Sequence, residues 1–120
     1  MNVLITGANG FIGRRLVSRL ANESHFVVAA DRADSLEPLP AGVRYVVSDL
    51  TDASAVLSAV KEPFVLVHLA WEMDRSKDQS RQVEHFAEML DASARSGLAR
   101  VVALGSSEEF GARGGVIREK

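Results

Sequence analysis

Residues 2–16, NVLITGANGFIGRRL, place three glycines three positions apart directly behind a short apolar run. A continuously apolar, β-branched run that ends at a glycine is typical of a strand buried on both faces of a parallel sheet. Residues 11–22 then repeat apolar side chains every four positions with arginines between them, which predicts an amphipathic helix. The sequence therefore predicts a strand, a glycine-rich turn and a helix, in that order.

Four more apolar runs predict strands, at residues 25–30, 43–47, 64–69 and 99–104. Strands that alternate with helices indicate an α/β fold with a parallel sheet. Right-handed crossovers then favour a doubly wound Rossmann sheet with strand order 3-2-1-4-5. We expect this domain to span residues 1–111, and the glycine-rich residues 112–120 to form a flexible tail.

Two helices are expected after the third and fourth strands. Thr51 and Asp52 can cap a short helix that runs to about Val60. A long helix is expected over about 79–96, and Gly97 ends it. Its buried face is predicted to contain Val83, Phe86, Ala87, Leu90 and Ala94.

Composition excludes several classes of function. The chain has 120 residues and a net charge of −2, so it has no broad basic surface for nucleic acid. It has no cysteine, which excludes disulfides and thiolate metal sites and suits a reducing cytoplasm. His25, His68 and His85 have no metal-ligand spacing, and we expect no metal. We also expect no membrane span and no signal peptide, because no apolar run approaches ~18 residues and no basic segment precedes Val3.

Each glycine of the first turn has a physical reason to be there. Gly7 can make a tight turn, Gly10 lets the backbone approach a phosphate, and Gly13 lets the helix pack closely on the strand. The helix would present unpaired N–H groups to an anion, with Phe11 and Ile12 as donors to a pyrophosphate. The blander interpretation is that glycines merely punctuate a turn. No Lys-Ser/Thr pair follows Gly13, which disfavours a nucleoside-triphosphate P-loop.

Asp31 supports a dinucleotide. It ends the second predicted strand, 18 residues after Gly13, where a carboxylate can accept hydrogen bonds from both ribose hydroxyls of an adenosine. Such an acid favours NAD, because it would repel the 2′-phosphate of NADP. Arg32 keeps NADP open, since a guanidinium directly after the acid could pair with that phosphate.

The stretch TGANGFIG, residues 6–13, resembles the TGxxGxxG signature of the NAD-dependent epimerase/dehydratase family, the extended short-chain dehydrogenase/reductases. Asp49-Leu50 resembles the pair in which the acid contacts adenine, residues 68–70 (HLA) resemble the segment that ends the fourth strand beside the cofactor, and residues 105–111 (GSSEEFG) resemble a stretch after the fifth. The cofactor-binding residues implied are Gly7, Asn9, Gly10, Phe11, Ile12, Gly13, Asp31, Arg32, Asp49, Leu50, Leu69 and Ala70.

The resemblance also implies chemistry, which is hydride transfer at a sugar or similar hydroxyl carbon. It places the substrate-orienting serine at Ser106, with Ser107 as the near alternative. The family's Tyr-x-x-x-Lys pair is absent, because the only tyrosine is Tyr45 and position 49 is Asp. The family's Asn-Val-x-Gly-Thr stretch is also absent, and residues 82–86 (QVEHF) occupy its place.

We therefore interpret the chain as the N-terminal part of a nucleotide-sugar epimerase, dehydratase or reductase, truncated before its acid/base pair. It should bind a dinucleotide without turning over, and a sugar-type substrate would need a C-terminal lobe. The alternative is a non-catalytic NAD(P)(H)-binding sensor or regulatory module. A homodimer is expected, because the helix near 79–96 lies where the family dimerises by helix packing.

Overall fold

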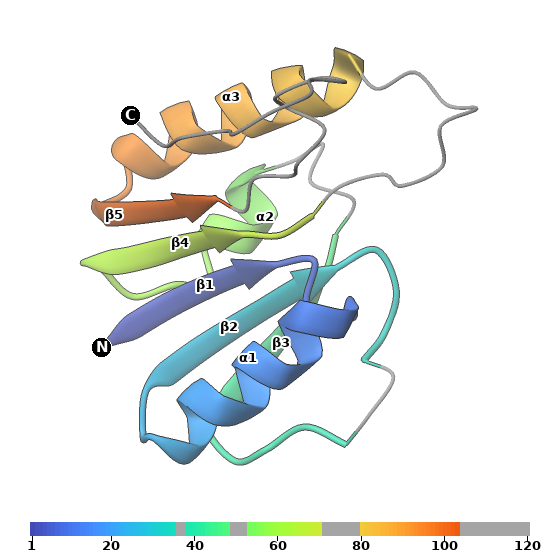
Figure 1. The fold of residues 1–120 in the computed structure, drawn as a ribbon. Coiled ribbons are helices and arrows are strands. Elements are labelled where there is room, and N and C mark those ends of the chain that lie inside the picture. Colours follow the sequence, from blue (N-terminus) through green and yellow to red (C-terminus); the bar gives the residue numbers. More distant parts are fainter. Residues whose placement is uncertain (36–37, 49–52, 71–79, 104–120) are drawn as a thin grey trace, which may run out of the picture.

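The computed structural model describes residues 1–35, 38–48, 53–70 and 80–103, and for residues 80–82 the backbone alone. It contains the predicted alternation of strands and helices (Figure 1). The elements are β1 (Asn2–Thr6), α1 (Phe11–Asn22), β2 (Phe26–Asp31), β3 (Val43–Val47), α2 (Ala53–Leu57), β4 (Phe64–His68), α3 (Ser80–Ala94) and β5 (Leu98–Ala103).

The five strands form one sheet in the order β3-β2-β1-β4-β5, and every neighbouring pair is parallel. This confirms the predicted doubly wound topology. Predicted strand ends differ from the observed ones by one residue, as is usual at element boundaries. The helix α2 is shorter than expected, and its predicted cap residues, Thr51 and Asp52, lie outside the described residues.

Two apolar layers pack against the sheet. Helix α1 covers one face, where Val3 and Ile5 of β1 meet Val17. Helices α2 and α3 cover the opposite face, where Leu4 of β1 meets Val56 and Met89 (Figure 1). The alternation of Val3, Leu4 and Ile5 between the two layers explains why β1 has no polar face.

The predicted buried face of α3 is partly wrong. Met89 and Ser93 are the buried residues of this helix, with Phe86 and Leu90 half-buried beside them. Val83 is 61% exposed, and Ala87 and Ala94 are exposed as well. The apolar arc of α3 is wider than its contact with the sheet, so a period of 3.6 residues alone does not say which part of the arc is covered.

Strand β5 forms one edge of the sheet. Val101 and Val102 remain 40% and 47% exposed on it, in contrast to the buried residues of β1 and β2. Within the described ranges, no helix is long and apolar enough to cross a membrane.

Candidate functional site

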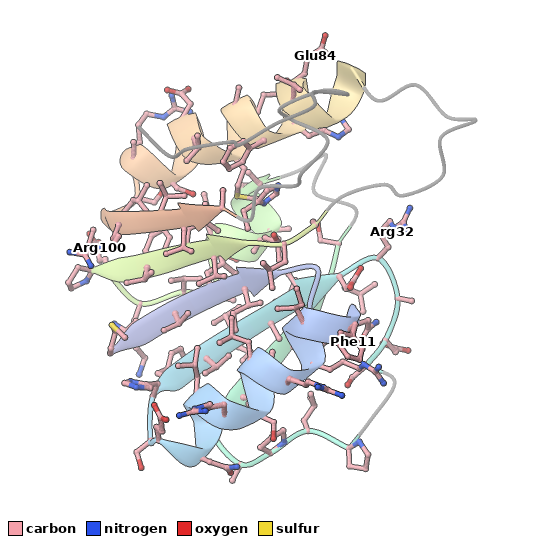
Figure 2. The ribbon with its side chains drawn as sticks, in the orientation of Figure 1. Phe11, Arg32, Glu84 and Arg100 are labelled. Carbon is pink, nitrogen blue, oxygen red and sulfur yellow. The ribbon has the colours of Figure 1, made fainter. Side chains whose placement is uncertain are left out.

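The carboxyl ends of the parallel strands bring separate polar segments to one edge of the sheet. Strand β1 ends at Thr6, β2 at Asp31 and β4 at His68, and β1 is hydrogen-bonded to both of the others. Figure 2 shows Phe11, which begins α1, and Arg32, which follows β2, on this side of the molecule. In open α/β sheets, the carboxyl edge at the point where strand order reverses is where ligands bind. Here that point lies between β1 and β4.

Gly7 makes the turn out of β1. Its φ is +71°, a left-handed conformation that disfavours side chains. A Cβ on Gly7 would lie 2.7 Å from both the Ala70 amide nitrogen and the Leu69 carbonyl carbon. The turn therefore packs directly on the backbone that follows β4, where the sequence places Leu69 and Ala70 beside a cofactor.

Gly13 lies in the first turn of α1 and is buried. A Cβ there would collide with the Gly7 carbonyl oxygen and lie 2.9 Å from the Ala8 Cα. The helix can approach the end of β1 this closely only because position 13 has no side chain. Gly10 is less crowded, since its nearest neighbour would be the Gly7 oxygen at 3.2 Å.

The N-terminus of α1 is built without a side-chain cap. Gly10 is the N-cap residue, and the first turn contains no acidic side chain. The Arg14 amide donates the first bond of the helix to the Gly10 oxygen, so the amides of Phe11, Ile12 and Gly13 precede the intrahelical ladder. Such amides and the helix dipole favour an anion at this position.

The carboxylate of Asp31 is held beside this turn. The Asn9 amide donates to its Oδ2 at 2.8 Å, and the Arg32 amide donates to its Oδ1 at 2.7 Å. The side-chain nitrogen of Asn9 donates to the carbonyl oxygens of Ala33 and Asp34 at 3.3 and 3.0 Å. Asn9 thereby joins the glycine turn to the loop after β2. Each carboxylate oxygen keeps a further lone pair for a ligand hydroxyl.

Tyr45 lies on β3, and its side chain is hydrogen-bonded to Asn9 of the glycine turn. Its Oη donates to the Ala33 carbonyl oxygen at 2.7 Å. Burial, and then the nearby Asp31 carboxylate, raise the pKa of Tyr45 above its ordinary value of 10.0. A phenol with a raised pKa is a poor general base near neutrality, which agrees with the exclusion of Tyr45 as an acid/base residue.

His68 closes β4 as a buried residue. It is 8% exposed, and its Nδ1 lies 2.8 Å from the Thr6 hydroxyl oxygen. Burial lowers the pKa of His68 from its ordinary 6.5 to about 4. The imidazole is therefore neutral at pH 7.

This low pKa makes the stability of the chain depend on pH. The unfolded chain takes up the proton near 6.5 and the folded chain only near 4, so the contribution of His68 is full above about pH 6.5 and is lost as the pH falls toward 4. Between about pH 7.5 and about pH 5 we expect a loss of about 2 kcal/mol in the free energy of unfolding. Urea unfolding at several pH values measures it. In His68→Asn, which keeps an acceptor for Thr6, this pH dependence of the free energy of unfolding should disappear. An unchanged pH dependence would contradict its assignment to His68.

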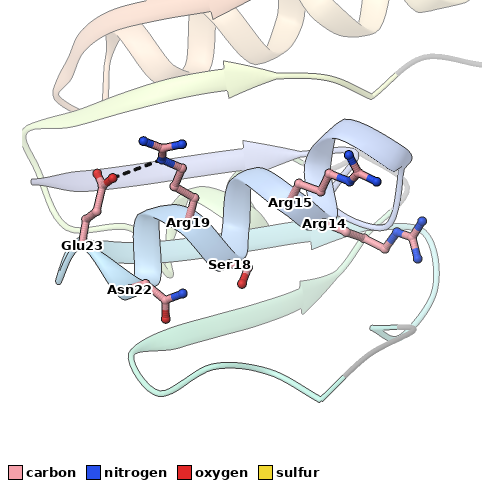
Figure 3. A pocket seen from close by; sticks show the side chains of 6 residues that line it. All are labelled: Arg14, Arg15, Ser18, Arg19, Asn22 and Glu23. Atoms are coloured by element: carbon pink, nitrogen blue, oxygen red, sulfur yellow. Dashed lines mark hydrogen bonds and ion pairs between the residues drawn. The ribbon is translucent and has the colours of Figure 1, made fainter.

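A second feature is an open hollow on the outer surface of α1. Figure 3 shows its lining, and the dashed line marks the 3.2 Å ion pair between Arg19 and Glu23. At the other end of the helix, the guanidinium of Arg15 lies 4.2 Å from the centre of the Phe11 ring. These cations are engaged locally and face away from the sheet. The hollow is lined by Arg14, Arg15, Ser18, Arg19, Asn22 and Glu23.

The structure brings together the predicted site residues that it describes. Gly7, Asn9, Gly10 and Asp31 lie at one edge, with Leu69 and Ala70 packed behind Gly7. Phe11, Ile12 and Gly13 begin α1 at the same edge, and the exposed Arg32 follows Asp31. The remaining predicted residues, Asp49, Leu50, Ser106 and Ser107, lie outside the described residues, as do 112–120. Among the residues that are described, no group of three or more His, Asp or Glu could hold a metal ion.

Two residues of this edge were missed by reasoning from the sequence. The Thr6 hydroxyl contacts His68 and the backbone after it, and the ring of Phe86 stacks on His68 with centroids 4.5 Å apart. The available signal was Thr6 itself, a polar residue at the end of an otherwise apolar buried strand. Phe86 was assigned only to a helix face.

Comparison with known proteins agrees with this geometry. The model of the NAD dependent epimerase/dehydratase family matches residues 3–120. The chain belongs to this family. Among solved structures, the epimerase/dehydratase chain is similar to MoeE5 in complex with UDP-glucose and NAD, with a TM-score of 0.76 and 31% identity over 98% of this chain and 40% of that one.

Curated proteins are similar at the level of sequence. An uncharacterized protein of Mycobacterium tuberculosis is 34% identical over 111 residues, which are 91% of this chain and 12% of that protein. The dTDP-6-deoxy-L-talose 4-dehydrogenase (NAD(+)) of Aggregatibacter actinomycetemcomitans is 30% identical over 117 residues, 92% of this chain and 43% of the enzyme. The chain thus spans less than half the length of these relatives.

Proposed function

We propose that this chain binds NAD at the carboxyl edge of its sheet, with the pyrophosphate at the N-terminus of α1 and the adenosine ribose at Asp31. The observation that carries the proposal is the placement of the Asp31 carboxylate, which the Asn9 amide holds beside an uncapped helix start. The first-turn amides suit a pyrophosphate, and a fixed carboxylate suits a pair of vicinal hydroxyls. Relatives described with NAD support the same cofactor.

NAD is the preferred cofactor in this proposal. The two backbone donors fix the Asp31 carboxylate at the ribose position, where a 2′-phosphate would meet a second negative charge. The Arg32 side chain is exposed next to that position and is the residue through which NADP could be accepted. The proposal ranks NADH above NADPH and assigns the residual affinity for NADPH to Arg32.

Replacing Asp31 with Asn should weaken NADH binding about 10- to 100-fold, because charge-assisted hydrogen bonds to the ribose are lost. The same change should narrow the preference for NADH over NADPH, since the repelling charge is gone. Calorimetric titration of both variants with NADH and NADPH measures the two effects. Asp34→Asn is the matched control, because it removes an exposed carboxylate three residues further along the same loop. Equal affinity of the wild-type and Asp31→Asn chains would remove Asp31 from the site.

We place the activity of the longer protein in the class of nucleotide-sugar epimerases, dehydratases and reductases, with Ser106 as the substrate-orienting residue. The support is the family membership and the UDP-glucose with which the similar MoeE5 structure is in complex. Residues 1–120 contain neither a second tyrosine nor a Tyr-x-x-x-Lys pair, so these residues alone should bind cofactor without turnover. The cysteine-free composition suits the cytoplasm as the location.

We also propose that two copies associate through α3. The support is the apolar stripe of Val83, Ala87 and Ala94, which is exposed in the single chain. Small and branched apolar residues at helical spacing allow close packing of two helices. Sedimentation equilibrium should give a dimer for the wild-type chain and a weaker dimer for Val83→Glu. A monomer at all concentrations would contradict this association.

A further inference from the structure

A cluster of three side chains lies beneath the glycine turn and comes from three elements. Thr6 ends β1 and is fully buried, His68 ends β4, and Phe86 lies in the first half of α3. The Thr6 Oγ1 is 2.8 Å from the His68 Nδ1, and the rings of His68 and Phe86 are stacked with an interplanar angle of 16°. A contact chain therefore runs from α3 through β4 to the residue before Gly7.

The hydrogen bonds around Thr6 indicate which ring nitrogen of the neutral His68 carries the proton. The Leu69 and Ala70 amides both donate to the Thr6 Oγ1, at 3.1 and 3.3 Å, and the Leu69 amide is shared with the Thr6 carbonyl oxygen at 3.2 Å. These two donors use the lone pairs of the hydroxyl, which leaves its own proton for a third partner. That partner is the His68 Nδ1, which must then be the unprotonated nitrogen. The neutral ring consequently has its proton on Nε2.

The two amides that donate hydrogen bonds to Thr6 belong to the segment that packs on Gly7. A Cβ on Gly7 would lie 2.7 Å from the Ala70 nitrogen and 2.8 Å from the Leu69 oxygen. The position of this segment therefore limits where the Gly7 turn can lie. The Gly7 turn also limits the position of α1, because the Gly7 oxygen packs against Gly13 of that helix.

Phe86 holds the imidazole from the other side. Its ring covers the face of His68 in a parallel stack. Phe86 ends the QVEHF stretch, residues 82–86, near the start of α3. The buried, neutral state of His68 therefore depends on a residue of α3 that lies 18 positions further along the chain.

We propose that His68 is a positioning residue: held under Phe86 as the Nε2–H tautomer, it orients the Thr6 hydroxyl, fixes the Leu69–Ala70 backbone against Gly7, and so couples α3 to the glycine turn. The identity of the ligand at the turn rests on the proposed function. The coupling between α3 and the turn does not. His68 and Phe86 need not contact the ligand. Their effect on affinity is transmitted by the backbone after β4.

Nitrogen-15 NMR of the histidine side chains of the full chain tests the tautomer without any substitution. At pH 7 we expect His68 in one neutral form, with Nδ1 unprotonated and Nε2 protonated. His25, which is partly exposed beside Glu23, serves as the internal comparison. A His68 ring protonated on Nδ1, or one that exchanges between tautomers, would overturn the proposal.

Substitutions at Thr6 test the transmission. Thr6→Val keeps the shape of the side chain but removes the hydroxyl, and should release the tautomer and speed hydrogen exchange of the Ala70 amide at least about tenfold, whereas the Leu69 amide keeps its bond to the carbonyl oxygen of residue 6. NADH affinity should fall about tenfold, which corresponds to about 1.4 kcal/mol. Thr6→Ser keeps the hydroxyl and should restore all three readouts. Unchanged amide exchange in a folded Thr6→Val chain would overturn the proposal.

Phe86 provides a second variant that leaves the hydroxyl in place. Phe86→Ala should raise the midpoint of the His68 titration toward 6.5, because the ring is opened to water, and should speed exchange of the Ala70 amide. Phe86→Leu, which still covers the ring, should do neither. A His68 midpoint unchanged by Phe86→Ala would overturn the role of α3. Failure of the wild-type chain to bind NADH would overturn the proposed function, while the tautomer and exchange results still decide the coupling.

Discussion

The chain in which Gly13 is replaced with Ala should lose about 2 kcal/mol or more of its free energy of unfolding. Helix propensity alone predicts the opposite, a gain of about 1 kcal/mol on replacing a helical glycine with alanine. The gain is outweighed because the new methyl group would overlap the Gly7 carbonyl oxygen and lie 2.9 Å from the Ala8 Cα. These neighbours are backbone atoms of a turn fixed between β1 and α1, so α1 itself must move away from the sheet. Overpacking of this kind costs about 1–3 kcal/mol or more.

Urea unfolding followed by circular dichroism measures this loss. Ser18→Ala is the matched control, because it also introduces alanine into α1, at a position where the side chain is exposed. It should change the free energy of unfolding by no more than about 0.5 kcal/mol. A Gly13→Ala chain as stable as the wild type would mean that α1 does not pack on the turn as closely as described.

The largest effect on ligand binding is expected for Gly10→Val, which should weaken NADH binding more than about 100-fold while the chain stays folded. Gly10 has φ −68° and ψ 169°, values that any residue adopts, and its Cβ would meet only the Gly7 oxygen at 3.2 Å. The fold therefore tolerates a side chain at position 10. Binding of the proposed pyrophosphate does not, because a branched side chain at the N-cap occupies the space in front of the first-turn amides.

Calorimetry with NADH, paired with thermal unfolding of the same samples, separates the two effects of Gly10→Val. The control Ser18→Val introduces the same side chain on the exposed part of α1 and should leave affinity unchanged. Retained NADH affinity in Gly10→Val would refute the assignment of the loop. Loss of both folding and binding would show instead that Gly10 is required by the backbone.

Much of this architecture could be predicted because its signals are local. The apolar run before Gly7, the four-residue period of α1 and the acid at the end of β2 each depend on residues close in sequence. Right-handed crossovers then leave few possible strand orders, and the observed order was the one expected. The close packing at Gly13 was also expected, since the third glycine of such a turn lets the helix approach the strand.

What could not be predicted depends on contacts between distant segments. The covered face of α3 is one case, because Met89 and Ser93 are selected by the position of the helix on the sheet and not by its period. The link between Thr6 and His68 spans 62 positions of sequence, and neither residue carries a local sign of its partner. Asn9 was assigned to the motif, but its bonds to the loop after Asp31 depend on how that loop returns to the turn.

The order of the strands in the sheet also has a consequence for synthesis of the chain on the ribosome. Strand β1 is made first, yet it is the central strand, and its partner on one side is β4 at residues 64–68. At about 5–20 residues per second, several seconds pass between the emergence of the two strands. During this interval β1 can pair with β2 alone, and its other edge stays open, with Leu4 not yet covered by α3. The nascent chain therefore exposes an apolar strand with one unpaired edge until its middle third has been translated. Binding of a chaperone at the tunnel exit would protect the chain from aggregation during this period.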